Sequence, residues 1–330
     1  MGVEPEIEPV RWGILSTARI NAMLVPPLHE SPLSDVVAVA SRSQERAGDY
    51  AGDWSIPRAY GSYQELLEDR EVEAIYISLP NAPHVEWSIR CLEAGKHVLC
   101  EKPLARHPDE VTRAFDAADR AGRLLMEAFM WRHHPQTQRL LELVRGGAIG
   151  ELRLVRASFS FTIGDTNVRL EPDLAGGALM DVGCYCVSGA RLLAGEPDLA
   201  IARQVVGPTG VDMRLVGVLE FPGGTLAELD CAFDLPPRQG LEAVGSEGVL
   251  NVPWPWGANE PMIELRRGHD VQRFQIEPAD RYRRQVDNFS RAIRGIEPPL
   301  LGRDDALGQA RAIDALYRSA ESGGTPVAVA

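Results

Sequence analysis

The stretch RWGILSTARI, residues 11–20, joins a short apolar run to a turn of small and polar residues. A segment with helical periodicity follows at 20–29, and the same succession recurs as far as Ala128. Further apolar runs lie at 36–40, 74–78, 97–100 and 124–128, and further helical segments are predicted at 44–50, 84–94 and 108–121. Strands that alternate with helices predict an α/β fold, in which a doubly wound parallel sheet of Rossmann type is covered on both faces.

The residue pattern of the sequence changes after Gly150. Long runs rich in β-branched and aromatic residues follow at 151–161, 213–221 and 225–235, and we expect them to form a large, mostly antiparallel sheet with one solvated face. Two helices are predicted in this half, from Gly177 to the glycine stop at Gly195 and over about 304–319, and the segment 252–261 is predicted to be an irregular loop. The chain therefore divides into a nucleotide-binding domain at 1–128 and an α+β domain at 129–330, whose final helix is a candidate to pack back on the first domain.

The bulk properties exclude several classes of protein. A chain of 330 residues with 45% hydrophobic and 25% charged residues is long enough for two cores, and its net charge of −13 disfavours nucleic acid and anionic membranes as partners. The start of the chain lacks the pattern of a secretory signal, and no apolar run approaches the roughly 18 residues of a membrane span, so we expect a cytoplasmic protein. The five cysteines have no paired spacing and His133 and His134 are adjacent, so neither a disulfide framework nor a metal site is predicted.

The turn after the first strand is the predicted pyrophosphate site, because ligands of open parallel sheets bind beyond the carboxyl ends of the strands. Small side chains there let backbone N–H groups approach phosphates, and the candidate residues are Ser16, Thr17, Ala18, Arg19 and Ile20. The glycine fingerprint of dinucleotide sites is degenerate in this turn, since Ser16, Ala18 and Asn21 occupy the three glycine positions. The position of the turn, between the first strand and the first helix, is what favours a dinucleotide.

The end of the second strand indicates which dinucleotide binds. Ser41, Arg42 and Ser43 stand where an acidic residue would hold the ribose of NAD. A guanidinium and a hydroxyl suit a 2′-phosphate, because both donate hydrogen bonds to it and the guanidinium also carries the opposite charge. NADP(H) is therefore the predicted cofactor and NAD(H) the less favoured one, although an arginine after a strand is more often simply solvated.

The run AGKHVLCEKPL, residues 94–104, places Lys102 at the carboxyl end of a buried strand, directly before a proline that keeps it extended. This run resembles the glucose-fructose oxidoreductase and inositol dehydrogenase family (Gfo/Idh/MocA), whose Glu-Lys-Pro motif supplies the catalytic lysine, often with a cis lysine-proline bond. The resemblance extends along the chain through residues 12–20, 80–84, 127–136 and 167–185. Residues 167–185 are most similar to the branch of dimeric dihydrodiol dehydrogenase, NADP-dependent xylose dehydrogenase and deoxysugar ketoreductases, where a tyrosine, here Tyr185, replaces a histidine.

Asp181 and Tyr185 are four residues apart in the predicted helix and therefore project from one face. The resemblance implies that Lys102 and Tyr185 are catalytic, and we assign Tyr185 to the substrate proton. Lys102 is expected to stabilise alkoxide character and to depress the pKa of Tyr185, while Asp181 orients a substrate hydroxyl or the cofactor ribose. Arg169 and Trp131 are further candidate substrate contacts, and the other candidate cofactor contacts are Tyr63, Leu79, Pro80, Asn81, His84 and Glu101.

The predicted protein is thus an NADP(H)-dependent oxidoreductase that transfers hydride between nicotinamide C4 and a carbinol or carbonyl carbon of a sugar, keto-sugar or related cyclic polyol. Two alternatives remain open at this point. One is a trans-dihydrodiol dehydrogenase, and the other is a non-catalytic sugar- or nucleotide-sensing co-regulator with the same fold, against which the presence of Lys102 and Tyr185 argues. The resemblance also implies a homodimer or homotetramer formed through the second-domain sheet, where 215–219 and 226–233 alternate apolar residues.

Overall fold

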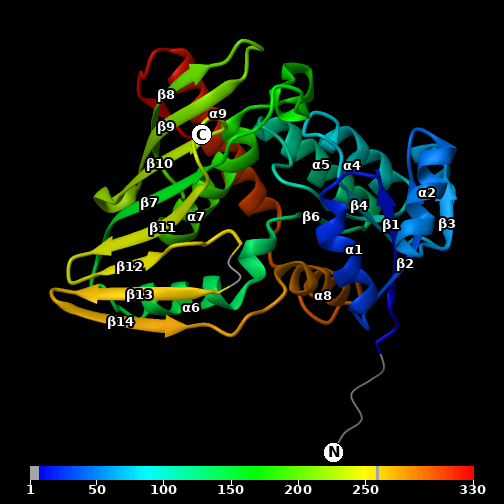
Figure 1. Ribbon diagram of the computed structural model, residues 1–330, viewed down its shortest axis with the longest axis horizontal. Helices are drawn as coiled ribbons and strands as arrows, with labels where there is room; N and C mark the ends of the chain where they lie inside the picture. The colour runs from blue at the N-terminus through cyan, green and yellow to red at the C-terminus, as the bar shows by residue number, and fades with distance from the viewer. Residues whose placement is uncertain (1–6, 258–259) are drawn as a thin grey trace, which may run out of the picture.

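The computed structural model describes residues 7–257 and 260–330, which build two sheets with helices between and around them (Figure 1). The first sheet has six parallel strands in the order β3-β2-β1-β4-β5-β6. Its strands are β1 (Val10–Leu15), β2 (Ser34–Ala40), β3 (Arg58–Tyr60), β4 (Ala74–Ile77), β5 (His97–Cys100) and β6 (Leu125–Glu127). Because β1 pairs with β2 on one side and with β4 on the other, the chain reverses its direction of winding at β1, where open α/β sheets bind ligands.

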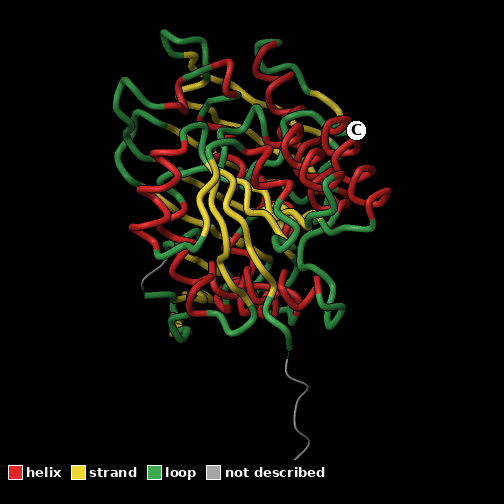
Figure 2. The backbone as a smooth tube through the Cα atoms, turned by 90° about the vertical axis from the view of Figure 1, so that its right-hand side faces the viewer, coloured by secondary structure: helices red, strands yellow, loops and turns green. Residues whose placement is uncertain are grey.

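Helices lie on both sides of this sheet, as Figure 2 shows with the six-stranded sheet toward the viewer. They are α1 (Asn21–Glu30), α2 (Gln44–Trp54), α3 (Tyr63–Glu68), α4 (His84–Glu93) and α5 (Pro108–Ala121). The strand residues are buried on both faces, and Trp12, Ile14 and Tyr76 have no exposed surface. The predicted doubly wound parallel sheet is confirmed. The sequence patterns missed only β3 and α3, which are 3 and 6 residues long.

The second sheet has nine strands in the order β14-β13-β12-β11-β7-β10-β9-β8-β15. The strands are β7 (Leu152–Ser160), β8 (Leu199–Val206), β9 (Asp212–Glu220), β10 (Leu226–Ala232), β11 (Arg238–Gly245), β12 (Val249–Val252), β13 (Met262–Arg267), β14 (Asp270–Gln275) and β15 (Val327–Ala328). Most neighbours are antiparallel, as expected, but β7 and β10 pair in parallel with Leu154 opposite Leu226. The predicted large, mostly antiparallel sheet is therefore confirmed, with this parallel pair at its centre.

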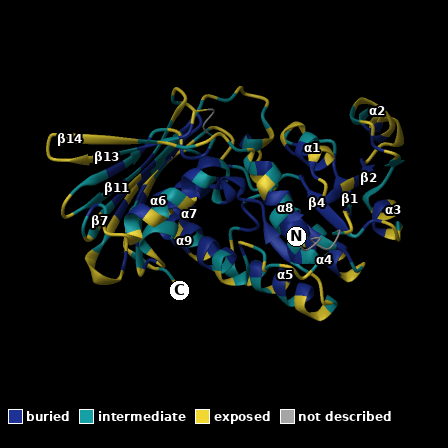
Figure 3. Cartoon of the chain, turned by 90° about the horizontal axis from the view of Figure 1, so that it is seen from below, coloured by how far each residue is buried: buried dark blue, intermediate teal, exposed yellow. Residues whose placement is uncertain are grey.

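Helices cover only the face of the second sheet that looks toward the first domain (Figure 3). They are α6 (Pro135–Arg145), α7 (Cys184–Ala194) and α9 (Arg303–Glu321), whereas α8 (Arg281–Ile293) packs against α1 and β2 of the first sheet. The helix predicted from Gly177 begins with a π-helical turn, Leu179–Gly183, before α7 proper, and it stops at Gly195. The final helix α9 packs against β8 and also against α5, where Arg303 forms ion pairs with Asp116 and Asp119.

The proline-rich segment predicted as a loop at 252–261 is irregular between β12 and β13, and Ala258 and Asn259 lie outside the described residues. Trp256 from this loop is 2% exposed, and its ring packs against Trp131 at 4.8 Å and Tyr185 at 5.8 Å between centroids. The loop therefore contributes a core residue that supports the helix face carrying Tyr185.

Candidate active site

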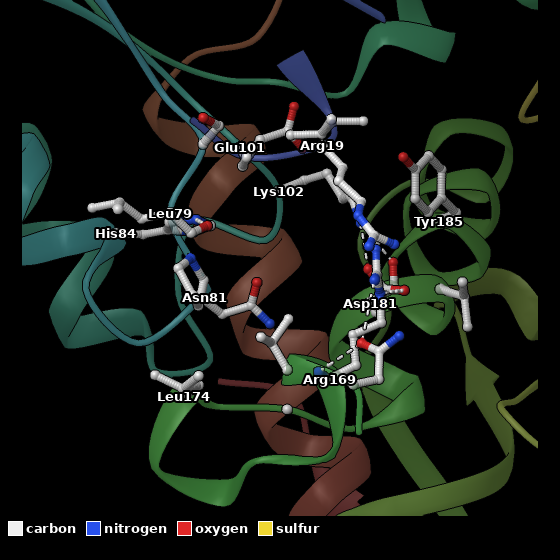
Figure 4. A pocket seen from close by; sticks show the side chains of 18 of the residues that line it. Arg19, Leu79, Asn81, His84, Glu101, Lys102, Arg169, Leu174, Asp181 and Tyr185 are labelled. Carbon is white, nitrogen blue, oxygen red and sulfur yellow. Dashed lines mark hydrogen bonds and ion pairs between the residues drawn. The ribbon is translucent and has the colours of Figure 1, made fainter. Parts of the chain in front are cut away.

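A cavity of about 670 Å³ lies beyond the carboxyl ends of β1, β4 and β5, where the first sheet faces the start of α7. Its lining comes from both halves of the chain (Figure 4). The residues are Thr17, Ala18, Arg19, Ile20, Ser78, Leu79, Pro80, Asn81, His84, Glu101, Lys102, Met130, Phe159, Phe161, Thr166, Asn167, Val168, Arg169, Leu174, Gly176, Asp181, Val182, Tyr185 and Tyr282. Most of the sequence-predicted site residues therefore meet in one place.

The turn after β1 has the shape that a glycine would give it. Ser16, at the first glycine position of the fingerprint, has φ +121°, a conformation that side chains rarely adopt. Hydrogen bonds hold it there: its hydroxyl is 2.8 Å from that of Ser78 and accepts from the Ala18 N–H, while its carbonyl accepts from Asn21 Nδ2 at 2.8 Å. Ile20 precedes α1 without a side-chain cap, but the N–H groups of Asn21, Ala22 and Met23 donate to the carbonyls of Ala18, Arg19 and Ile20 in the turn at 18–20.

Lys102 follows β5 and reaches across to the second domain. Its Nζ donates to the backbone carbonyl of Asp181 at 2.7 Å and to Asp181 Oδ1 at 3.1 Å. Arg169 Nε donates to the other carboxylate oxygen at 2.6 Å, so Asp181 lies between two cations, as Figure 4 shows. The Lys102–Pro103 peptide bond is cis, which is the form that the resemblance implies.

These charges fix one another's ionisation. Burial lowers the pKa of Lys102, but the neighbouring acidic groups, Asp181 first among them, together outweigh it, and the net pKa lies well above the ordinary value for lysine. Burial likewise raises the pKa of Asp181, and the neighbouring Lys102 and Arg169 reverse this, so that its pKa is lowered. Lys102 is therefore an ammonium and Asp181 a carboxylate throughout the neutral range.

Tyr185 stands beside the ammonium group. Lys102 Nζ lies 4.9 Å from the centroid of the Tyr185 ring, and the Tyr185 hydroxyl donates only to Met130 Sδ, at 3.5 Å. The expected depression of the Tyr185 pKa by Lys102 is wrong in its net direction: burial raises this pKa more than the nearby cation lowers it, and the result lies well above 10. Tyr185 is consequently a neutral phenol whose proton has a weak partner, because a thioether sulfur is a poor acceptor.

His84 and Glu101 are buried next to Lys102. His84 Nδ1 is 2.9 Å from the Pro103 carbonyl and its Nε2 is 2.8 Å from the Leu79 carbonyl, so the imidazole ties the loop after β4 to the loop after β5. Glu101 Oε1 accepts from the Tyr76 hydroxyl at 2.6 Å, and burial raises the pKa of this carboxyl despite the opposing effect of Lys102. Asn81 Nδ2 donates to the Ala175 carbonyl at 2.9 Å, which joins the two halves of the chain at the rim of the cavity.

Five predicted residues do not line the cavity. Ser16 is buried in the turn after β1, where its hydroxyl lies against that of Ser78. Ser41, Arg42 and Tyr63 lie at the ends of β2 and the start of α3, on the neighbouring part of the same sheet edge. Trp131 is 1% exposed and packs edge-on against Trp256, behind Tyr185, because its large ring fills the core between α7 and the second sheet. Trp131 is thus a supporting residue of the wall and not a residue of its surface.

Other lining residues escaped the sequence analysis. Met130, Phe159, Phe161 and Tyr282 form the apolar part of the wall. Met130 belongs to the segment 127–136, in which Trp131 is the candidate contact. Phe159 lies near the end of β7 and Phe161 directly after it, with no local sign that this end faces a cavity. Tyr282 comes from α8, more than 100 residues away from Lys102 along the chain, and only the fold brings it near.

Within the described ranges, no group of three or more histidine, cysteine or acidic side chains is arranged to hold a metal ion, and the five cysteines are buried free thiols. His133 and His134 are both buried; burial is the main cause that lowers the pKa of His133 to about 3. Over residues 7–257 and 260–330 no helix has the length and apolarity that crossing a membrane requires.

Comparison with known proteins relates this geometry to enzymes. D-xylose 1-dehydrogenase (NADP(+)) 2 of Haloferax volcanii is 41% identical over 318 residues, which cover 94% of this chain and 98% of the relative. Trans-1,2-dihydrobenzene-1,2-diol dehydrogenase of Xenopus laevis is 36% identical over 74% of this chain and 75% of its own. A 3-ketoreductase from Actinomadura kijaniata, solved in complex with NADP and TDP-benzene, superposes with a TM-score of 0.89 at 32% identity and covers 94% of this chain and 98% of that one.

The sequence profiles of one family account for both halves of the molecule. Residues 10–129 match the oxidoreductase family with an NAD-binding Rossmann fold, and residues 137–251 match the C-terminal domain of the same family. These matches, together with the cavity between the two sheets, confirm the resemblance found in the sequence: the chain belongs to the Gfo/Idh/MocA family of oxidoreductases.

Proposed function

We propose that the protein is an NADP(H)-dependent oxidoreductase that interconverts a carbinol and a carbonyl on a sugar, a keto-sugar or a related cyclic polyol. The observation that carries this proposal is the pairing of the Lys102 ammonium with the neutral phenol of Tyr185 in a cavity at the point where the first sheet reverses its winding. The high identity to a xylose dehydrogenase over nearly the whole chain makes an aldose the first substrate to test.

The residues on the first sheet fit a dinucleotide. The glycine-like Ser16 turn before α1 suits a pyrophosphate, because its small side chains let phosphates approach the backbone. Exposed Arg42 with Ser41 suits the 2′-phosphate of NADP. Leu79, Pro80, Asn81 and His84 border the same cavity and are proposed to contact the nicotinamide end. When bound, the cofactor supplies or accepts the hydride.

The protein's own side chains then handle the substrate oxygen and its proton. Lys102 Nζ, held by Asp181, donates a hydrogen bond that stabilises negative charge developing on that oxygen. During reduction, Tyr185 Oη gives its proton to the oxygen and becomes a phenolate, which solvent protonates again. During oxidation, Tyr185 first releases its proton to solvent, and its phenolate then takes the proton of the carbinol. Arg169 and Asp181 line the same cavity next to Lys102, where they are proposed to orient the substrate hydroxyls.

A substrate panel tests this function. Aldoses beginning with D-xylose, keto-sugars and trans-dihydrodiols are assayed with NADP⁺ or NADPH by the absorbance of the reduced cofactor. We expect turnover on at least one sugar class, and Lys102→Ala should lower kcat about 10²- to 10³-fold, as for the loss of one preorganised donor, while NADPH still binds.

The control for this variant is the only other lysine of the sequence. Lys96 lies before β5 at the opposite end of the strand, and its Nζ donates to the carbonyls of Asp69 and Val72. Lys96→Ala should therefore reduce stability but not the turnover of the folded protein. Full activity of Lys102→Ala on a confirmed substrate would refute the assignment, and a protein that binds NADPH but turns over no member of the panel would favour the sensor alternative.

We further propose that the protein self-associates through the open face of the nine-stranded sheet. Val216 of β9 and Leu226 of β10 are 56% and 41% exposed on that face, which no helix of the described chain covers. Sedimentation of the wild type should give a dimer or tetramer, and Val216→Asp should shift it toward the monomer. A monomeric wild type at micromolar concentration contradicts this proposal.

A further inference from the structure

The helical segment that carries Asp181 and Tyr185 takes its cap from a distant strand. Ala178, the residue before the π-helical turn Leu179–Gly183, provides no side-chain hydrogen bond. Asp212, at the start of β9, supplies the missing acceptor, because its Oδ2 accepts from the Leu179 N–H at 2.7 Å. This carboxylate is 4% exposed and comes from the second sheet, 33 residues further along the chain.

The surroundings of Asp212 are built around its carboxylate. Oδ1 accepts a hydrogen bond of 2.8 Å from the Tyr317 hydroxyl, which α9 provides. On the other side stands Gly177, with φ +121°, where any Cβ would overlap Asp212 Oδ1 and the Tyr317 hydroxyl. The glycine that leads into the helical segment is therefore required both by its backbone conformation and by the space that the carboxylate occupies.

The same turn sets the position of the catalytic ammonium. Asp181 follows Leu179 by two residues, and both its backbone carbonyl and its Oδ1 accept hydrogen bonds from Lys102 Nζ. A shift of the first turn would therefore move both acceptors at once, and with them Lys102 and its stacking on Tyr185. Misplacement of reacting groups by about 1 Å costs an enzyme on the order of 10²-fold in rate.

We propose that Asp212 is a positioning residue of the reaction, whose ionised carboxylate anchors the π-helical turn so that Asp181 holds Lys102 against Tyr185. The inference rests on the proposed function, since it assigns Asp212 a role that acts through Lys102 and Tyr185. Asp212 itself does not line the cavity that those residues share.

The charge state of Asp212 varies within the working range of an enzyme. Burial raises the pKa of this carboxyl to about 6, against the lowering effect of its hydrogen bonds with Leu179 and Tyr317. The groups that face it are the Tyr317 phenol, the Cys231 thiol and, across the Tyr317 ring at 4.2 Å, the Arg106 guanidinium. Asp212 and Tyr317 border a second cavity of about 410 Å³, through which protons reach the carboxyl from solvent. The charged or titratable residues that also line this cavity are Arg106, His107, Glu110 and Glu321.

The sign of the pH effect follows. Above about pH 6 the carboxylate is ionised and accepts a charge-assisted hydrogen bond from Leu179, and below it the carboxyl is protonated and this bond weakens. Turnover should therefore fall as the pH decreases through about 6. Tyr317→Phe removes a donor to the carboxylate and should move this acid limb to higher pH, with kcat on the alkaline plateau kept within about 3-fold of the wild type.

Asp212→Asn separates positioning from stability. The asparagine amide has the shape of the carboxylate but not its charge, so kcat should fall about 10-fold or more, with little change in the KM for NADPH. The decrease of kcat at acidic pH should disappear in this variant. The pKa of Asp212 is higher in the folded protein than its ordinary value, so ionisation at pH 8 opposes folding. The amide removes that opposition, and the thermal midpoint of Asp212→Asn at pH 8 should equal or exceed that of the wild type.

The matched control is Ser319→Ala, which removes a buried hydroxyl from the same helix as Tyr317. Ser319 Oγ accepts from the Ala202 N–H and donates to the Thr325 carbonyl, away from the cavity, so this variant should lose stability and keep the wild-type pH profile. The inference is overturned if the pH profiles of kcat in Asp212→Asn and Tyr317→Phe both match that of the wild type. If Asp212→Asn fails to fold, an unshifted pH profile of kcat in Tyr317→Phe alone overturns it. The proposed function survives those outcomes as long as Lys102→Ala and Tyr185→Phe lose turnover, and it fails separately if these two variants stay active.

Discussion

Single side chains in the site have properties that depend on neighbours far away in the sequence. The presence of Lys102, Asp181 and Tyr185 in one site could be predicted from motifs, but the balance of their pKa values could not. Burial of the Tyr185 ring outweighs the attraction of Lys102, and the phenol keeps its proton. Asp181 is held between Lys102 and Arg169, a double ion pair that sequence spacing alone does not specify.

The proton role of Tyr185 can be tested by removing its hydroxyl. Tyr185→Phe keeps the ring that packs against Phe129 and Phe159, so the fold and cofactor binding should persist. Turnover should fall about 10²- to 10⁴-fold, as expected for the loss of a general acid or base. Steady-state kinetics with NADPH fluorescence titration measure both quantities, and a fully active variant would transfer the role to another acid.

Arg42 can be tested through cofactor preference. Arg42→Asp should weaken NADPH by about 1.5–3 kcal/mol, the value of a charge-assisted hydrogen bond, and should affect NADH much less. Dissociation constants for both cofactors provide the measurement, and Arg113→Asp on the exposed side of α5 is the control for the change of charge. Equal losses for NADPH and NADH would show that Arg42 does not read the 2′-phosphate.

At the scale of elements, the long segments expected from their periodicity formed, whereas α6 and α8, 11 and 13 residues long, and several strands of the second sheet were not expected. The helix predicted at 108–121 is α5 with the same bounds, because Pro108 and Gly122 mark both of its ends. The three-residue strand β3 is too short to show a period, and β7 pairs in parallel with β10 because pairing direction depends on the chain's long-range path. The π-helical turn before α7 is stabilised by Asp212 from another element, which no local pattern reveals.

At the scale of the molecule, the two sheets are joined by contacts that also surround the cavity. Helix α8 packs against α1 and β2, and α9 packs against α5 and β8, so the C-terminal helices tie the second half of the chain to the first. Glu73 beside β4 accepts two hydrogen bonds from Arg294 after α8, and these charges lower the pKa of Glu73 although burial opposes them. The sequence indicated the two domains, and the pairing of charges between them emerged only from the fold.

Buried histidines predict how the stability of the whole molecule depends on pH. Burial lowers the pKa of His133 to about 3 from an ordinary 6.5, so the unfolded chain binds a proton below pH 6.5 that the folded protein refuses. The free energy of unfolding should therefore decrease as the pH falls, by about 1.4 kcal/mol per pH unit for this histidine. Urea denaturation of His133→Gln between pH 7 and 5 should show a shallower decrease.

The control for this experiment is His269→Gln, in the exposed turn between β13 and β14. It should leave the pH dependence of the wild type unchanged. If His133→Gln has the same slope as the wild type, the histidine is protonated in the folded state and its buried environment is more polar than its contacts indicate.

The two lysines of this sequence have a practical consequence for chemical labelling. Lys96 is 5% exposed and its Nζ donates hydrogen bonds to two backbone carbonyls, and Lys102 Nζ donates to Asp181. Apart from histidine, every other basic side chain of the sequence is an arginine. Reagents that acylate or alkylate lysine side chains therefore have no surface target on the folded protein. An adduct on Lys96 under native conditions therefore reports on local opening, whereas an adduct on Lys102 reports on entry of the reagent into the cavity, and protection of Lys102 by ligands measures the occupancy of that cavity.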